Sequence, residues 1–139
     1  MHAYTVSYED FNGNPRTETL YFHMANSELI MMEAEYEKFG GISGRLRQVV
    51  LDREGSVIVE FVKDLVSKSY GRKSEDGRRF VKTEEERVEF LQSNAYEQIF
   101  LELAFNATKA AEFVNKVLPV NLSKDVDKIS GDPHTWISP

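Results

Sequence analysis

The apolar residues between Ser56 and Ser69 constrain the fold of this chain more than any other feature. They recur at intervals of one, three and four residues: Val57, Ile58, Phe61, Val62, Leu65 and Val66. This spacing gathers them on one broad face of an α-helix. The sequence therefore predicts a long amphipathic helix that contributes one face to the core.

The residues that follow predict an abrupt end of this helix and then a surface loop. Gly71 stands where a left-handed C-terminal cap would lie, a conformation that glycine adopts without steric cost. The polar segment 72–80, RKSEDGRRF, contains an Asp-Gly pair that is typical of a turn. Thr83, with Glu86 three residues later, predicts a capping box at the start of the next helix.

The first 23 residues have the period of β-strands instead. Apolar and polar side chains alternate over 3–9 and again over 17–22, as in strands with one buried face. The Asn12-Gly13 turn between them predicts a β-hairpin over 3–23. Because an isolated hairpin is only marginally stable in water, one of its faces must pack on helices or on a partner.

Helical spacing also predicts further helices over 26–39, 42–51, 84–92, 95–105 and 107–118. We expect Asn26 or Ser27 to cap the first of them and Asn106 to cap the last, while Ser93-Asn94 breaks or recaps the chain between the third and fourth. The predicted fold class is α+β, a mostly α-helical bundle with an N-terminal β-hairpin.

Length and composition indicate a single domain with a tail. The chain has 139 residues, of which 41% are hydrophobic and 29% charged, as in soluble globular proteins. We expect residues 1–119 to form one domain. Residues 120–139 lack an apolar period, so we expect them to form a poorly ordered tail. No apolar run approaches the roughly 20 residues of a membrane span. The absence of cysteine fits a reducing cytoplasm.

The formal net charge of -6 argues against general nucleic-acid binding, which needs a basic face. Five cationic residues nevertheless cluster between positions 72 and 82: Arg72, Lys73, Arg78, Arg79 and Lys82. Acidic residues interrupt this cluster and follow it directly. A solvated loop with local ion pairs is the favoured interpretation, and a phosphate-binding patch is the alternative.

No motif in the sequence indicates catalysis, a metal site or a cofactor. His2, His23 and His134 have no second ligand at metal-binding spacing. The serines lack a nucleophile-elbow context, and no phosphate-binding or dinucleotide-binding glycine loop is present. We therefore expect a binding protein that is not an enzyme. The Met31-Met32 pair either fills the core, as helical methionines usually do, or lines an adaptable groove.

Three segments resemble tail assembly chaperones of long-tailed, siphovirus-type bacteriophages. They are VSYEDFNGNPRTETLYFHMANSEL (6–29), SYGRKSEDGRRF (69–80) and FLQSNAYEQIFLELAFNATKAAEFVNKVLP (90–119), in matching order and spacing. The hairpin opening and the second segment, taken together, are fairly specific to this family. The resemblance covers residues 1 to about 120 and gains nothing from the tail.

The resemblance implies a late, non-enzymatic protein of the host cell cytoplasm. Such chaperones bind the tape measure protein and keep it soluble during tail tube assembly, and they are absent from the mature virion. A longer form, made by ribosomal frameshifting, recruits the tail tube protein, so this chain would be the short form. Self-association is a further possibility, without nucleic acid or membrane. The alternative is a small nucleic-acid-binding or other phage regulatory protein.

We expect the partner, an apolar helical segment, to bind where aromatic and arginine side chains gather, since these types are enriched at binding hot spots. The predicted partner-binding residues are Tyr8, Phe11, Tyr70, Arg72, Arg78, Arg79 and Phe80. The alternative is that the aromatic residues simply pack the hairpin onto the helices, which is the usual fate of such side chains.

Overall fold

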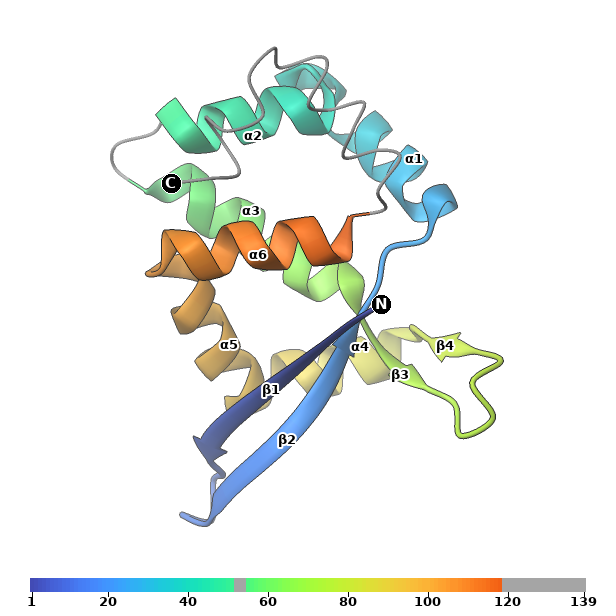
Figure 1. Cartoon of the computed structure of the whole chain (residues 1–139), viewed down its shortest axis with the longest axis vertical. Coiled ribbons are helices and arrows are strands. Elements are labelled where there is room, and N and C mark those ends of the chain that lie inside the picture. Colours follow the sequence, from blue (N-terminus) through green and yellow to red (C-terminus); the bar gives the residue numbers. More distant parts are fainter. Residues whose placement is uncertain (52–54, 119–139) are drawn as a thin grey trace.

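The computed structural model describes residues 1–51 and 55–118, so the predicted tail at 120–139 lies outside the described residues. In chain order the elements are β1 (His2–Glu9), β2 (Pro15–Phe22), α1 (Asn26–Glu35), the 3-10 turn η1 (Glu37–Phe39), α2 (Gly41–Leu51), α3 (Ser56–Ser69), β3 (Tyr70–Lys73), β4 (Phe80–Val81), α4 (Glu84–Leu91), α5 (Asn94–Ala104) and α6 (Ala107–Val117). The predicted α+β class is confirmed (Figure 1).

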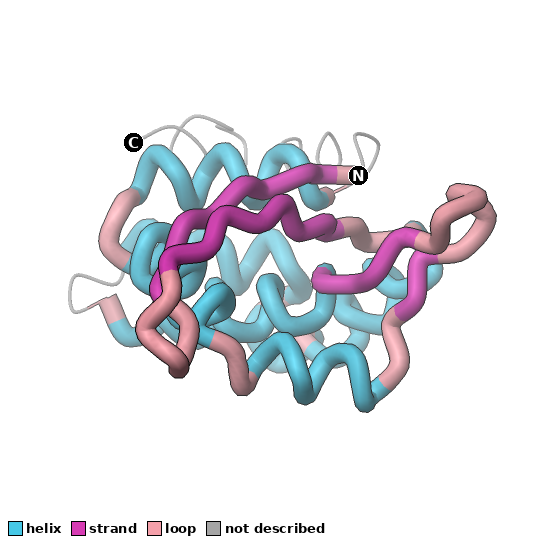
Figure 2. The backbone as a smooth tube through the Cα atoms, turned by 90° about the horizontal axis from the view of Figure 1, so that it is seen from below, coloured by secondary structure: helices cyan, strands magenta, loops and turns pink. Residues whose placement is uncertain are grey.

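The strands form one antiparallel sheet in the order β1-β2-β3-β4, which lies across one side of the helices (Figure 2). Val6 is buried, and its neighbours Tyr4 and Tyr8 are half-buried on the same face of β1. The opposite face is exposed, and Thr5 and Thr19 form a hydroxyl pair on it at 2.9 Å. The predicted hairpin, with one face packed on helices, is confirmed.

Phe22, at the end of β2, lies at the centre of the core and is 0% exposed. Four aromatic rings surround it edge-on, with centroids 5.2 to 6.5 Å from its own: Tyr4, Tyr70, Phe90 and Phe113. These rings come from β1, β3, α4 and α6. One side chain therefore joins the sheet to two helices that are distant in the sequence.

The predicted left-handed cap at Gly71 is wrong. Tyr70 takes an extended conformation, with φ -66° and ψ 141°, and begins a strand that pairs with the end of β2. The glycine is needed for another reason, because the ring of Phe80 packs on its Cα. A Cβ at Gly71 would stand 2.4 Å from Cε2 of that ring.

The segment 72–80 is not simply a loop, since β3 and β4 make it a second short hairpin. Its Asp-Gly turn is confirmed. The Asp76 carboxylate accepts bonds from the Ser74 hydroxyl at 2.7 Å and the Arg78 amide at 3.0 Å, and Gly77 has a φ of 74°. The turn projects into solvent, so the expected surface position holds for its tip.

Three predicted helix starts are confirmed. Thr83 Oγ1 accepts a hydrogen bond from the Glu86 amide at 3.2 Å, and the side chains of Ser93 and Asn106 cap α5 and α6 in the same way. The capping box at Thr83 is only half formed. The Glu86 carboxylate instead accepts a bond from Arg72 Nε on β3, at 2.8 Å.

The predicted cap of α1 is wrong, because Ala25 occupies the N-cap position and not Asn26 or Ser27. Alanine has no side-chain acceptor, so the helix start depends on Glu28. Its Oε1 accepts a hydrogen bond from the Ala25 amide at 3.0 Å. A carboxylate in the first turn also interacts favourably with the helix dipole.

Candidate partner-binding site

Helix α1 exposes two large apolar side chains, Ile30 at 71% and Met31 at 67%. Their neighbours Leu29 and Met32 are buried. Successive residues of an α-helix point about 100° apart, so a run of four apolar residues spans far more than one face. Two of the four must therefore face away from the core, and here they are adjacent.

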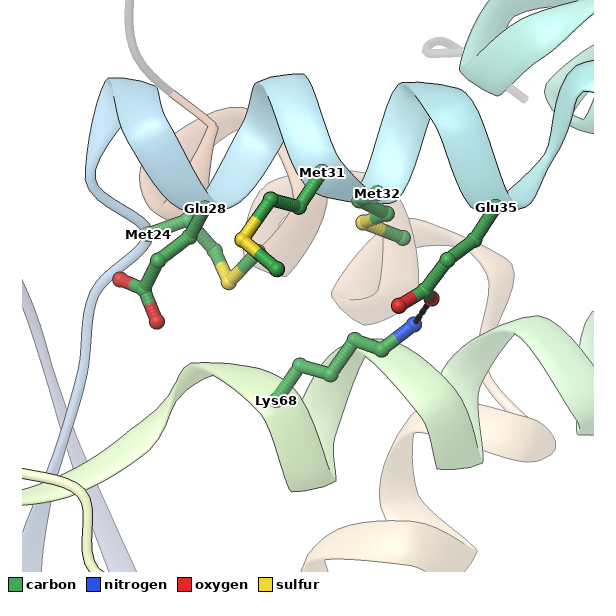
Figure 3. Close-up of a pocket in the computed structure, with 6 residues that line it drawn as sticks. All are labelled: Met24, Glu28, Met31, Met32, Glu35 and Lys68. Atoms are coloured by element: carbon green, nitrogen blue, oxygen red, sulfur yellow. Dashed lines mark hydrogen bonds and ion pairs between the residues drawn. The ribbon is translucent and has the colours of Figure 1, made fainter.

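A groove lies beside Met31, between α1 and the end of α3 (Figure 3). Its volume is about 160 Å³, and it is lined by Met24, Glu28, Met31, Met32, Glu35 and Lys68. We call it the methionine groove. Met24 and Met32 are buried in its floor, and Met31 is exposed at its rim. Unbranched thioether side chains adapt to differently shaped partners.

One end of the methionine groove is fixed by Lys82, which directly follows β4. Its Nζ donates to Glu28 Oε2 at 2.7 Å, to the His23 carbonyl at 2.6 Å and to the Lys68 carbonyl at 2.8 Å. Burial lowers the pKa of Lys82, and Glu28 opposes this shift only in part. The ammonium thus joins the starts or ends of four elements: β2, β4, α1 and α3.

The other end is closed by Lys68, whose Nζ donates to Glu35 across the groove and to Asp64 at 2.9 Å (Figure 3). Burial alone would lower the pKa of Lys68, but these two bonds outweigh it and raise the pKa. Tyr36 also donates to Asp64, and burial together with this bond raises the pKa of its hydroxyl. The Lys68 ammonium and the Tyr36 hydroxyl therefore keep their protons at neutral pH.

The two predicted binding residues of the first hairpin have different surroundings. Tyr8 is half-buried on the inner face of β1 and packs against the core. Phe11 lies in the turn between β1 and β2 and is 79% exposed. Only Phe11 therefore offers most of its ring to a partner.

The two predicted aromatic residues of the second hairpin are partly engaged within the protein. The Tyr70 ring stacks on Phe90, with centroids 4.0 Å apart and planes 11° apart. The Phe80 ring covers Gly71. Both side chains are half-buried, as the packing alternative expects.

The predicted arginines lie on the surface of the same hairpin. Arg72 is exposed and pairs with Glu86. Arg78 and Arg79 are exposed, and their amides hold the turn through Asp76 and Ser74. Their guanidinium groups leave a cationic tip that faces solvent.

The structure does not bring all seven predicted residues together. The turn between β1 and β2 and the turn between β3 and β4 lie at opposite sides of the molecule in both views (Figures 1 and 2). The second hairpin does adjoin the methionine groove, because Lys82 binds Glu28. The seven-residue site stays a prediction, and its two halves are separate surfaces.

Within residues 1–51 and 55–118, no group of three or more histidine, aspartate or glutamate side chains could hold a metal ion. His2 packs edge-on to Tyr4, and His23 packs edge-on to Phe80. Burial lowers the pKa of both imidazoles. His134 lies outside the described residues. None of the helices described is long and apolar enough to cross a membrane.

Comparison with known families supplies the deciding observation. A sequence model of a family described as phage tail assembly chaperone matches residues 1–134. The chain belongs to this family. No curated protein and no solved structure matches it. The resemblance seen in the three sequence segments is thus confirmed, and it extends into the tail region.

Family membership assigns this tail assembly chaperone to phage morphogenesis inside the host cell, a role that suggests no catalysis. Sequence reasoning identified Met31 and Met32 as possible groove residues but missed Glu28, Glu35 and Lys68. The run of four apolar residues at 29–32 was the available signal for an exposed patch on α1.

Proposed function

We propose that this tail assembly chaperone binds an apolar helical segment of the tape measure protein in the methionine groove and keeps that protein soluble during tail tube assembly. It would then leave before the virion is mature. The observation that carries the proposal is the exposure of Met31 at a methionine-lined cavity, on a helix that also exposes Ile30. Contiguous exposed apolar surface commonly marks an interaction site.

The occupant we infer is an amphipathic helix, because an apolar groove beside a helix accepts the apolar stripe of another helix. A tape measure protein is long, so different segments of it would present stripes of different shape. Methionine side chains can repack around each of them. Many copies of one small chaperone could thus cover one long chain.

Charge supports the second half of the proposal, the solubility of the complex. The chain carries a net charge of -6, and a net charge far from zero opposes association between complexes. The exposed arginines Arg78 and Arg79 lie on the turn of the hairpin whose base contacts the groove through Lys82 and Glu28, and they would attract acidic residues of the partner. Contact of the partner with Tyr8 and Phe11 remains a prediction. So do a frameshifted longer form of the chain and its contact with the tail tube protein.

The proposal predicts that Ile30→Ser combined with Met31→Ser abolishes solubilisation of the tape measure protein. Both side chains are exposed, so the change removes apolar contact surface without opening a cavity in the core. The measurement is the soluble fraction of the tape measure protein when both proteins are co-expressed. Leu51→Ser, at an exposed apolar position on α2, is the matched control and should behave as wild type.

Circular dichroism should show that all these variants are folded. If the α1 variant still solubilises the tape measure protein, the groove is not the site. Loss of solubilisation in Tyr8→Ala with Phe11→Ala, or in Arg78→Glu with Arg79→Glu, would then locate the site at one of the two hairpins.

A further inference from the structure

A second cavity adjoins the methionine groove. Its volume is about 320 Å³, and its lining includes Tyr36, Phe39 and Arg45. We call it the aromatic cavity. Glu35 and Lys68 line the aromatic cavity and the methionine groove alike. The two are therefore neighbours, and the residues that they share lie at the boundary between them.

The lining positions on each helix place the methionine groove and the aromatic cavity in one line. On α3 they are Glu60, Asp64 and Lys68, which lie four residues apart and so form one stripe along the helix. This stripe spans about 12 Å of helix. On α1 and η1 the lining positions advance from Glu28 to Phe39. The methionine groove reaches only Lys68 of the α3 stripe, and the aromatic cavity covers all of it.

The ion pair between Glu35 and Lys68 crosses this line at the boundary (Figure 3). Lys68 has a second carboxylate partner, Asp64, one turn earlier on its own helix at 2.9 Å. The Glu35 side chain is 54% exposed, and ion pairs at exposed positions contribute little to stability. Lys68 can therefore release Glu35 at small cost and stay paired with Asp64, which opens the boundary.

The aromatic cavity contains the side-chain types that are enriched at protein interfaces. The rings of Tyr36 and Phe39 meet edge-on with centroids 6.0 Å apart, and the Arg45 guanidinium lies over the Phe39 ring at 4.0 Å. The Nε of Arg45 is buried and has no hydrogen-bond partner among the described residues. The cavity thus combines apolar ring surface with an unsatisfied donor.

We propose that the apolar helix bound in the methionine groove continues into the aromatic cavity, and that the Glu35–Lys68 ion pair is a latch that opens to admit it. The inference rests on the proposed function, because the occupant is the same segment of the tape measure protein. A helix in a groove anchors itself with side chains at i, i+3 or i+4 and i+7, over about 10 Å. The stripe from Glu60 to Lys68 has the matching length.

A removable tether across the boundary tests the latch. The chain contains no cysteine, so Glu35→Cys with Lys68→Cys supplies two unique thiols. A bismaleimide with a central disulfide joins them, and dithiothreitol cleaves it again. The probes are overlapping synthetic peptides that span the tape measure protein, and fluorescence anisotropy measures their affinity for the full chain. The tether should weaken peptide binding at least about tenfold, and dithiothreitol should restore it.

Phe39→Ser tests whether the aromatic cavity is occupied. Loss of this ring should weaken binding of the same peptide at least about tenfold, as truncation of an interface anchor does. Phe105→Ser removes an exposed ring just after α5, outside both cavities, and should leave binding unchanged. Circular dichroism should show that both variants are folded.

A photo-crosslinking probe gives a second readout that leaves the packed rings in place. A benzophenone amino acid at Lys38, which is exposed and lines the aromatic cavity, should form an adduct with the tape measure protein on co-expression. Lys63 is an exposed lysine on α3 that lines neither cavity. The same probe at Lys63 should form no adduct.

Three results would overturn the latch and leave the proposed function standing. They are a tethered protein that binds the peptide as tightly as the cleaved one, a folded Phe39→Ser variant that binds as wild type, and an adduct from a probe at Met31 with none from the probe at Lys38. If wild type binds none of the peptides, or if Ile30→Ser with Met31→Ser binds them as wild type does, the proposed function falls and the latch falls with it.

Discussion

Replacing Phe22 by alanine is expected to lower the free energy of unfolding by about 3–5 kcal/mol, as truncation of a fully buried aromatic side chain does. The ring is surrounded by those of Tyr4, Tyr70, Phe90 and Phe113. These come from two strands and two helices, so no single neighbour can move to fill the space. Urea denaturation followed by circular dichroism gives the change directly.

The matched control is Phe11→Ala, which removes the same side chain from an exposed turn. Its effect should stay within about 0.5 kcal/mol, the usual range for surface substitutions. A loss of less than about 1 kcal/mol for Phe22→Ala would mean that the aromatic cluster does not hold the sheet on the helices.

The second large effect is expected for Lys82→Met, at about 2–3 kcal/mol. Methionine keeps the length of the side chain but leaves Glu28 and the carbonyls of His23 and Lys68 without the ammonium. Breaking a fully buried ion pair costs roughly 3–5 kcal/mol. The loss expected for Lys82→Met is smaller than this because the Lys82 side chain is still 19% exposed. Thermal and urea unfolding both measure this loss.

Two variants show whether the ammonium is responsible. Lys73→Met changes an exposed lysine on the same hairpin, and it should cost at most about 1 kcal/mol. Adding Glu28→Gln to Lys82→Met should recover part of the loss, because it removes an unpaired carboxylate. Equal losses for Lys82→Met and Lys73→Met would contradict the role given to Lys82.

Local patterns in the sequence were enough to predict the first hairpin and most of the helices. Alternating apolar and polar residues over 3–9 and 17–22 predicted two strands. In the structure these strands pair from His2↔Phe22 to Glu9↔Pro15. The central helix, predicted from the spacing of Val57 to Val66, is present over Ser56–Ser69. Ser93 and Asn106 cap the helices expected of them because a side-chain cap depends only on residues three positions apart.

The errors arose where distant residues determine the backbone. The local sequence at Tyr70 and Gly71 is typical of a helix end. In the structure these two residues pair with the end of β2 in the sheet, and the Phe80 ring packs on the glycine. Nothing within a few residues of Gly71 indicates that pairing. The start of α1 was misjudged for a different, local reason, because Glu28, three residues after Ala25, replaces the expected cap at Asn26 or Ser27.

The candidate site could be predicted only in part, for the same reason. The run of apolar residues at 29–32 indicates that α1 cannot bury all of them. Lys82 is 59 residues from the carbonyl of His23 that it binds, and Lys68 is 33 residues from Glu35. Such contacts follow from the packing of the elements, so no sequence spacing reveals them.

The central claim is that the methionine groove contacts the tape measure protein, and site-specific photo-crosslinking tests it most directly. A benzophenone amino acid would replace Met31, Phe11, Arg79 or Thr17 in turn, during co-expression with the tape measure protein. Thr17 is exposed on the outer face of the sheet and serves as the negative control. We predict a strong adduct with the tape measure protein from the probe at Met31 and none from the probe at Thr17. Adducts from the probes at Phe11 or Arg79, with none from the probe at Met31, would contradict the claim.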